Sequence, residues 1–285
     1  MMRLSLLLTL AIFLPRIICG QTTDVFAIAD SIEAEGRLLY QLERASWVGT
    51  DIVVEKHKEQ LEKAGGYLSY VMGEKVRCIF FSASEKPEAL ITIDFDSDIA
   101  PESAQVSTTA RPLTGEEKNL YAVREAAVER VSVDTMFKFY NNTSLNLIPL
   151  IRGERREVYI LTGPQQSGVV IFGNDYLITL DQKNKVVTAT QLHKNLIPIP
   201  YNPDDTTENP TSMHSHKEST EPWMTVTDVC TLLLYADYLP WEQHTVVAED
   251  YISWWNFEEQ NLVILTREAW DKIVKHQSEL QKEVE

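Results

Sequence analysis

The sequence predicts a mixed α+β fold, and three observations indicate that class. Hydrophobic residues make up 44% of the chain and charged residues 24%, an ordinary globular mixture that can bury a core. Apolar residues recur at helical spacing over residues 24–46, and short apolar runs separated by turn residues fill residues 157–192. We expect an α+β module at 21–113 and a mixed α/β domain at 114–285.

The first module is predicted to contain two helices and two strands. A helix over 24–46 would present one apolar stripe, formed by Ile28, Ile32, Leu38, Leu39 and Leu42. A second helix over 51–63 would end at the glycine pair 65–66, a possible C-cap. Strands are expected at 76–82 and 89–96, followed by a loop over 97–113.

The second domain begins at a capping-box pattern, Thr114 with Glu117, which predicts a helix to about Tyr140. The strands that follow are expected at 157–163, 168–173, 176–181 and 185–192. A loop over 198–212 leads to a buried helix at 226–239. Three further strands, at 244–250, 251–257 and 261–266, precede a last helix capped by Thr266.

Charge and the amino-terminal residues bear on location and partners. The formal net charge of −16 disfavours binding to nucleic acid or to anionic lipid surfaces. A short positive start and the apolar run 4–14 predict a signal peptide over residues 1–20, removed after Gly20 and followed by export to a periplasm or the outside. Lipid anchoring at Cys19 is the alternative. No later segment is apolar enough to span a membrane.

Only Cys78 and Cys230 would remain after cleavage of the signal peptide. In an exported protein they either form one disulfide or stay as two separate buried thiols, and the sequence leaves both alternatives open. Each lies in an apolar segment, which argues against a cysteine nucleophile.

The stretch SMHSHKESTEPWMTVTDVC, residues 212–230, carries the candidate chemistry. Residues i and i+2 of a strand face the same side, so His214 and His216 can approach one ion. Asp228 opens the next helix and can supply a third ligand. Two imidazoles and a carboxylate suit zinc, with a fourth position left for water. The alternative is a solvated loop in which Asp228 caps the helix and Thr225 or Thr227 is its N-cap.

The motif resembles that of the JAMM (MPN-type) zinc metalloproteases, in which His-x-His precedes a Ser-x-x-Asp element that opens a helix. Here the element runs from Thr225 to Asp228, and the resemblance covers about residues 115–270. It implies a curved mixed sheet flanked by helices, zinc held by His214, His216 and Asp228, and a glutamate as general base on the bound water.

The chain departs from the family pattern at several positions. Lys217 replaces the proline that usually follows the second histidine, and Thr225 replaces a serine that helps to stabilise the oxyanion. The resemblance implies a base at the start of an upstream strand, where Glu157 is the best candidate and Glu154 the next. His193 and His244 are predicted to pack in the protein rather than to bind metal.

Two functional hypotheses from different classes follow. The first is an exported zinc-dependent peptidase or isopeptidase with Glu157 as base, acting on an unidentified peptide or protein. The second is an exported, non-catalytic binding or scaffold protein with a degenerate site. A motif that arose by chance in an unrelated exported α+β protein is a third possibility.

Overall fold

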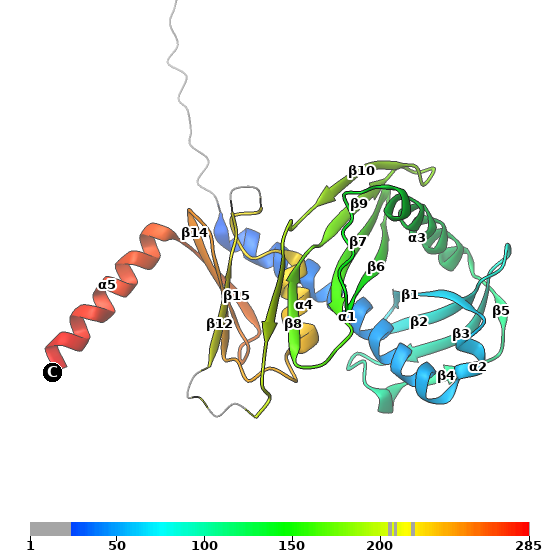
Figure 1. Ribbon diagram of the computed structural model, residues 1–285, viewed down its shortest axis with the longest axis horizontal. Coiled ribbons are helices and arrows are strands. Elements are labelled where there is room, and N and C mark those ends of the chain that lie inside the picture. Colours follow the sequence, from blue (N-terminus) through cyan, green and yellow to red (C-terminus); the bar gives the residue numbers. More distant parts are fainter. Residues whose placement is uncertain (1–23, 205–206, 208–209, 218–219, 285) are drawn as a thin grey trace, which may run out of the picture.

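The computed structural model describes residues 24–204, 207, 210–217 and 220–284 and has a mixed α+β architecture with open, mainly antiparallel sheets (Figure 1). The predicted fold class is confirmed at this level. The predicted signal segment 1–20, including Cys19 and Gly20, lies outside the described residues. The described part of the chain has five α-helices: α1 (Val25–Lys56), α2 (Lys58–Leu61), α3 (Gly115–Val133), α4 (Val226–Tyr235) and α5 (Arg267–Val284).

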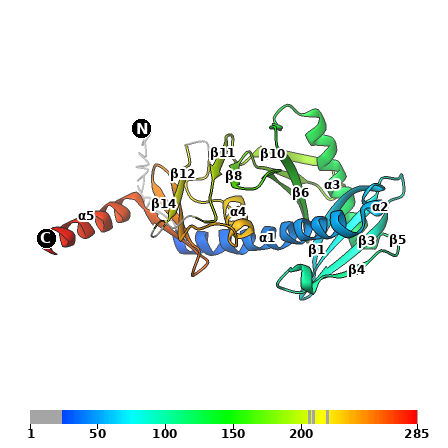
Figure 2. The same cartoon turned by 60° about the horizontal axis from the view of Figure 1, so that its bottom comes forward.

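Helix α1 runs along most of the molecule, as Figure 2 shows. Asp24 caps its first turn by accepting a hydrogen bond from the Ala27 N–H at 3.2 Å. The helix is longer than predicted, because residues 51–56 continue it instead of forming a second helix. One end packs on β1 and β2 and the other on α4 and β15. Helix α1 belongs to the predicted N-terminal module but packs on elements on both sides of the predicted boundary at 113/114. The boundary itself stays a prediction.

The first sheet is antiparallel, in the order β1-β2-β3-β4, with β5 also pairing with β3. Its strands are β1 (Ala64–Met72), β2 (Lys75–Ser82), β3 (Glu88–Phe95), β4 (Gln105–Ser107) and β5 (Arg111–Pro112). The predicted strands at 76–82 and 89–96 are confirmed. Strand β1 was missed, and the glycine pair 65–66 lies inside it at a register shift instead of capping a helix. The predicted loop contains a 3₁₀ turn, Pro101–Ser103, and the two short strands.

Helix α3 begins at the predicted capping box but ends at Val133, earlier than expected. The chain then enters the second sheet, whose strands lie in the order β10-β9-β7-β6. Strand β6, the first of these strands along the chain, was not predicted from the sequence. Residues 143–146, which were predicted only to break the preceding helix, belong to the ten-residue strand β6 because this strand pairs with β7 along its whole length. The strands are β6 (Thr143–Arg152), β7 (Arg155–Pro164), β9 (Tyr176–Leu180) and β10 (Val186–Gln191).

Two further sheets complete the fold. Strands β8 (Val169–Gly173) and β11 (Leu196–Pro200) form an antiparallel pair. The last sheet, β12-β13-β14-β15, contains the parallel pair β12–β13, joined through α4. Its strands are β12 (Thr211–Ser215), β13 (Gln243–Val247), β14 (Tyr251–Asn256) and β15 (Asn261–Thr266). The predicted loop 198–212 thus contains the end of β11 and the start of β12.

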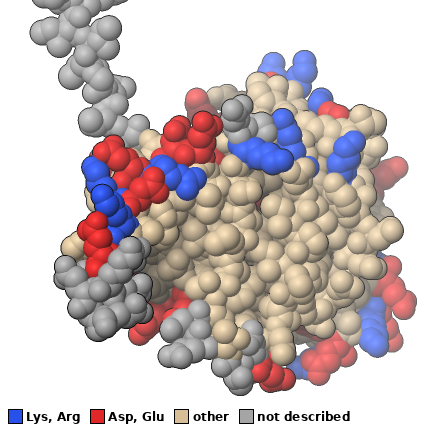
Figure 3. Space-filling model, turned by 60° about the vertical axis from the view of Figure 1, so that its left-hand side comes forward, with Lys and Arg blue, Asp and Glu red and all other residues tan. Residues whose placement is uncertain are grey.

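The last helix, α5, projects from this end of the molecule (Figure 1), and Thr266 caps it by accepting from the Ala269 N–H at 3.2 Å, as predicted. Figure 3 shows the face on this side. Lysine, arginine, aspartate and glutamate lie mainly around the margin of that face, and other residues fill its middle. Charged side chains are therefore sparse in the middle of this face.

The largest core lies where α1 crosses the first two sheets and α4. Cys78 on β2 and Cys230 on α4 are both fully buried in it as free thiols. Of the two alternatives for these cysteines, a disulfide or separate thiols, the structure shows two separate buried thiols. A second core joins the start of α1 to α4 and the last sheet, with Trp255 at 0% exposure. These two cores hold α4, and β12 is held by its pairing with β13, whose Val246 belongs to the second core.

Candidate metal centre

His214 and His216 point to the same side of β12, as their spacing predicts. His214 lies within the strand, and the His216 N–H continues the pairing by donating to the Val247 carbonyl at 2.9 Å. The side chains of His214 and His216 are 3% and 2% exposed, whereas the intervening Ser215 faces solvent. The Nε2 atoms of the two histidines are 3.0 Å apart. The strand therefore delivers two nitrogen ligands to one point.

Asp228 reaches the same point from the first turn of α4. Thr225 is the N-cap, and its N–H and hydroxyl both donate to Asp228 Oδ2 at 2.8 Å, while the Asp228 N–H donates to the Thr225 hydroxyl at 3.2 Å. His214 Nε2 lies 3.7 Å from Oδ1, and His216 Nε2 lies 3.5 Å from Oδ2. The structure thus brings together the three ligands expected from the sequence. The capping part of the alternative also holds, because Thr225 and Asp228 form a capping box, but these two side chains and the histidines are buried and not in a solvated loop.

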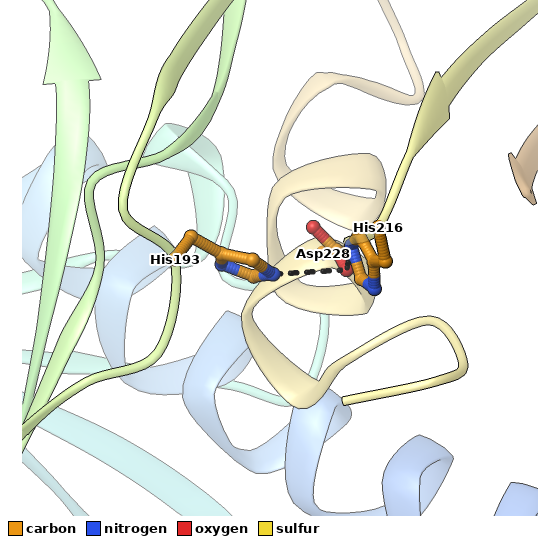
Figure 4. Close-up of side chains that lie close together, drawn as sticks. All are labelled: His193, His216 and Asp228. Atoms are coloured by element: carbon orange, nitrogen blue, oxygen red, sulfur yellow. Dashed lines mark ion pairs between the residues drawn. The ribbon is translucent and has the colours of Figure 1, made fainter. Parts of the chain in front are cut away.

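His193 is a fourth side chain at this point, although the sequence indicated only packing for it. It follows β10, and its Nε2 lies 3.7 Å from Asp228 Oδ2, opposite His216 (Figure 4). Its Nδ1 lies 3.2 Å from Oδ2 of the buried Asp175. The β9–β10 hairpin brings the two together, because Tyr176 pairs with Gln191 and the next residues outward are 175 and 192. The hairpin register was the one signal in the sequence that could have indicated this contact.

The separations between donor atoms suit tetrahedral coordination. At ligand distances of about 2.0–2.2 Å, two ligand atoms of a tetrahedral zinc lie about 3.3–3.6 Å apart. The observed separations among the Nε2 atoms and the Asp228 oxygens are 3.0, 3.5, 3.7 and 3.7 Å. His193, His216 and Asp228 have ligand atoms that all lie within 4.8 Å of one another, and His214 is outside this group of three. One ion can therefore contact donors from the β10–β11 loop, β12 and α4.

Two of these atoms are buried and have no hydrogen-bond partner: His193 Nε2 and Asp228 Oδ1. An unpaired buried polar atom costs about 1–3 kcal/mol, so two that face the same cluster need an explanation. A cation between them would satisfy both. The residues present therefore fit a metal ion.

The outer ring nitrogens of the histidines have partners that leave Nε2 free. His216 Nδ1 lies 2.9 Å from the Glu221 carbonyl, and His193 Nδ1 faces Asp175. His214 Nδ1 lies 2.9 Å from His244 Nε2, and His244 Nδ1 lies 2.7 Å from the Ser212 hydroxyl. Such partners fix the tautomer and orientation of metal-binding histidines. His244, expected to pack, does so between the rings of Phe172 and Trp241 while supporting His214.

The charges of the cluster also suit a metal. Burial lowers the pKa of His214 to about 4 and that of His244 to about 3, so both imidazoles are neutral at pH 7. Burial alone would raise the pKa of Asp228, but the three adjacent histidines hold it well below its usual value. Burial would lower the pKa of His193, but Asp228 and Asp175 raise it to about 9. The imidazolium of His193 thus occupies the place of a cation in the metal-free protein.

The predicted catalytic residues lie elsewhere or are already engaged. Glu157 on β7 accepts hydrogen bonds from Arg152 at 2.7 Å and Arg155 at 2.5 Å. The part of β7 that contacts the cluster is Thr162, whose N–H donates to Asp175. Five strand residues separate the two positions, roughly 17 Å. Glu154 is exposed in the turn before β7. A general-base role for either glutamate therefore rests on the sequence resemblance alone, and the Thr225 hydroxyl already donates to Asp228.

A small cavity of about 140 Å³ opens onto the histidines, with Phe172, Gly173 and Asn195 in its wall. His193, His214 and His216 line it together with Lys217. The volume holds a few water molecules rather than a peptide segment. A metal at this point would thus be reachable by water or a small ligand.

No protein-family model matches the chain, and comparisons with curated proteins and with solved structures find no similar protein. Among the described residues, no helix combines the length and the apolar character needed to cross a membrane. The geometry of the cluster is therefore the feature of the molecule that points to a function.

Proposed function

We propose that this protein is an exported zinc-binding protein in which His193, His214, His216 and Asp228 hold one ion. The observation that carries the proposal is the convergence of buried side chains on Asp228: His193, His216 and Asp228 have ligand atoms within 4.8 Å of one another, and His214 Nε2 lies 3.0 Å from His216 Nε2 and 3.7 Å from Asp228 Oδ1. Four nitrogen and oxygen donors form the closed set typical of structural zinc sites, whereas catalytic sites keep one position for water. On this proposal the ion links the β10–β11 loop, β12 and α4, and the protein acts by binding a peptide or protein partner.

Zinc-dependent hydrolysis of a peptide or isopeptide bond is the second candidate. The cavity of about 140 Å³ at the histidines favours it, because a metal-bound water would have room there. The JAMM-like spacing of His214, His216 and Asp228, and the curved sheet that it implies, point the same way. This candidate requires His193 to leave the fourth position open. Export in either case rests on the apolar run at 4–14, and lipid anchoring at Cys19 stays the alternative.

Elemental analysis of the purified protein tests the metal site. We expect about one zinc ion per chain in the unmodified protein after reconstitution, and a loss of nearly all of it in the variant His214→Ala, His216→Ala. The matched control is His57→Ala, His276→Ala, which removes two histidines outside the cluster and should keep the zinc. Equal metal content in the two variants would refute the site.

Cobalt substitution separates the two candidates. Tetrahedral cobalt gives intense visible bands both with four protein ligands and with three protein ligands and a water. The variant His193→Ala therefore makes the distinction, because it should change the bands only if His193 is the fourth ligand. Cleavage of a peptide library that stops with a chelator and is lost in Asp228→Asn would instead establish the hydrolase. Bands that depend on His193, with no cleavage, would support the binding role.

A further inference from the structure

A cavity next to α1 lies apart from the zinc ligands and has a buried carboxylate in its wall. The cavity has a volume of about 310 Å³ and lies between α1, the β6–β7 hairpin and α4. Glu43 is part of its wall and is only 6% exposed. The volume is at the lower end of the range for small-molecule sites.

Glu43 has no protein cation to balance it. Its Oε1 accepts a hydrogen bond from the Asn146 amide at 2.7 Å. None of the ion pairs found among the described residues includes Glu43. The nearest basic residue along the helix, Arg44, pairs with Asp237 and lies over the ring of Trp47. Burial raises the pKa of Glu43 to about 7, with only Asn146 acting in the opposite direction.

An isolated buried carboxylate is costly, so its retention in a cavity wall needs a physical reason. A ligand that brings a positive charge would remove this cost. Calcium and magnesium are poor candidates, because they need about six or more oxygen ligands and this wall offers one carboxylate with an amide. An organic cation needs only one countercharge and an apolar surface.

Aromatic rings supply that surface. Trp47, Tyr67 and Tyr235 all line the cavity and are only partly buried. The rings of Trp47 and Tyr235 are 5.4 Å apart and inclined by 52°, so they form two walls of a corner. Aromatic faces attract alkylammonium ions through their quadrupole while contacting the alkyl groups.

We propose that this cavity binds a small organic ammonium ion, with its charge paired to Glu43 and its alkyl part against Trp47, Tyr67 and Tyr235. The site is independent of the proposed zinc centre, since none of the four zinc ligands lines it. The ligand class includes simple amines and quaternary ammonium compounds. It also includes the ammonium group of a peptide or lysine side chain, if the rest of that molecule lies outside the cavity.

Titration of the whole protein with tetramethylammonium and propylammonium chlorides tests this, at constant ionic strength and by calorimetry. tert-Butanol is the neutral comparison, because it resembles tetramethylammonium in shape without its charge. We expect saturable binding of at least one ammonium ion and none of tert-butanol. Equal binding of the alcohol, or no saturable binding of either ion, would overturn the proposal.

Variants locate the binding. Glu43→Gln keeps the shape of the side chain and should weaken binding by at least about tenfold. The control is Glu55→Gln, which removes the same charge from an exposed position on the same helix and should bind normally. Trp47→Leu should weaken binding about fivefold and provides a second test if Glu43→Gln fails to fold. Unchanged affinity in a folded Glu43→Gln or Trp47→Leu would also overturn the proposal.

Discussion

The helices α3 and α4 begin with the same motif but present it to different surroundings. In both, a threonine N-cap is followed three residues later by a buried acid: Thr114 with Glu117, and Thr225 with Asp228. Glu117 is 0% exposed and Asp228 is 1% exposed. Each acid accepts the N–H of its threonine, at 2.7 and 2.8 Å. Locally the two helix starts are equivalent.

The difference lies in the remaining bonding capacity of each carboxylate. Arg111 donates to both oxygens of Glu117 at 2.7 Å, and the Tyr70 hydroxyl donates to Oε1 at 2.9 Å, so each oxygen has two partners. Asp228 has Oδ1 without a hydrogen bond and faces three imidazole nitrogens. Protein donors thus satisfy both oxygens of Glu117, whereas Asp228 Oδ1 is left without a donor and can bind a ligand.

We expect the largest difference between the two acids in the effect of their substitution on zinc affinity. Asp228→Asn keeps the size of the side chain but removes its charge, and we expect it to weaken zinc binding about 1000-fold, or about 4 kcal/mol. Glu117→Gln makes the same chemical change in the other capping box and should leave the affinity unchanged. Competition with a chromophoric chelator measures both. A similar loss in both variants would mean that Asp228 acts only through the fold.

The stability of the protein in acid tests the ion-paired carboxylate of Glu117 by itself. Burial would raise the pKa of Glu117, but Arg111, Thr114 and Tyr70 lower it to about 2. A lowered pKa stabilises the folded state above the unfolded value of 4.5, and this stability is lost as the pH falls through about 2. The shift corresponds to about 3 kcal/mol. Urea unfolding should show Glu117→Gln to be less stable at pH 7 by about that amount and less sensitive to pH between 5 and 2. An unchanged pH dependence would contradict this assignment.

The sequence predicted those parts of the fold that local pattern determines. Most strands of the second domain and both capping boxes have turn residues or polar signatures at their ends. The missed strands, Ala64–Met72 and Thr143–Arg152, form by pairing with a neighbour along their whole length. Their own sequences contain glycine, serine or asparagine at positions that a pattern search assigns to breaks. The helix predicted at 51–63 is observed as two pieces: residues 51–56 extend α1, which packs on two cores, and Lys58–Leu61 form α2.

The same distinction, between features set by local sequence and features set by pairing with another segment, applies to the candidate site. His214 and His216 are related by strand geometry and Asp228 by helix capping, so their meeting could be anticipated from residues 212–230. His193 and Asp175 reach the cluster through a hairpin, and the sequence around His193 is as apolar as a packing position. The Arg152 and Arg155 partners of Glu157 likewise depend on the β6–β7 turn.

We expect the smallest effects from substitution of the two threonine N-caps, Thr114 and Thr225. Loss of an N-cap hydroxyl costs about 1 kcal/mol, so Thr114→Ala and Thr225→Ala should destabilise the protein by similar amounts in urea unfolding. Only the Thr225 hydroxyl, however, donates to a carboxylate that faces the histidines. Removing a partner of a metal ligand typically weakens metal binding by 10- to 100-fold, and here we expect about tenfold for Thr225→Ala and no change for Thr114→Ala. Equal zinc affinities would show that the hydroxyl only caps the helix, whereas losses in both variants would show that zinc binding follows global stability.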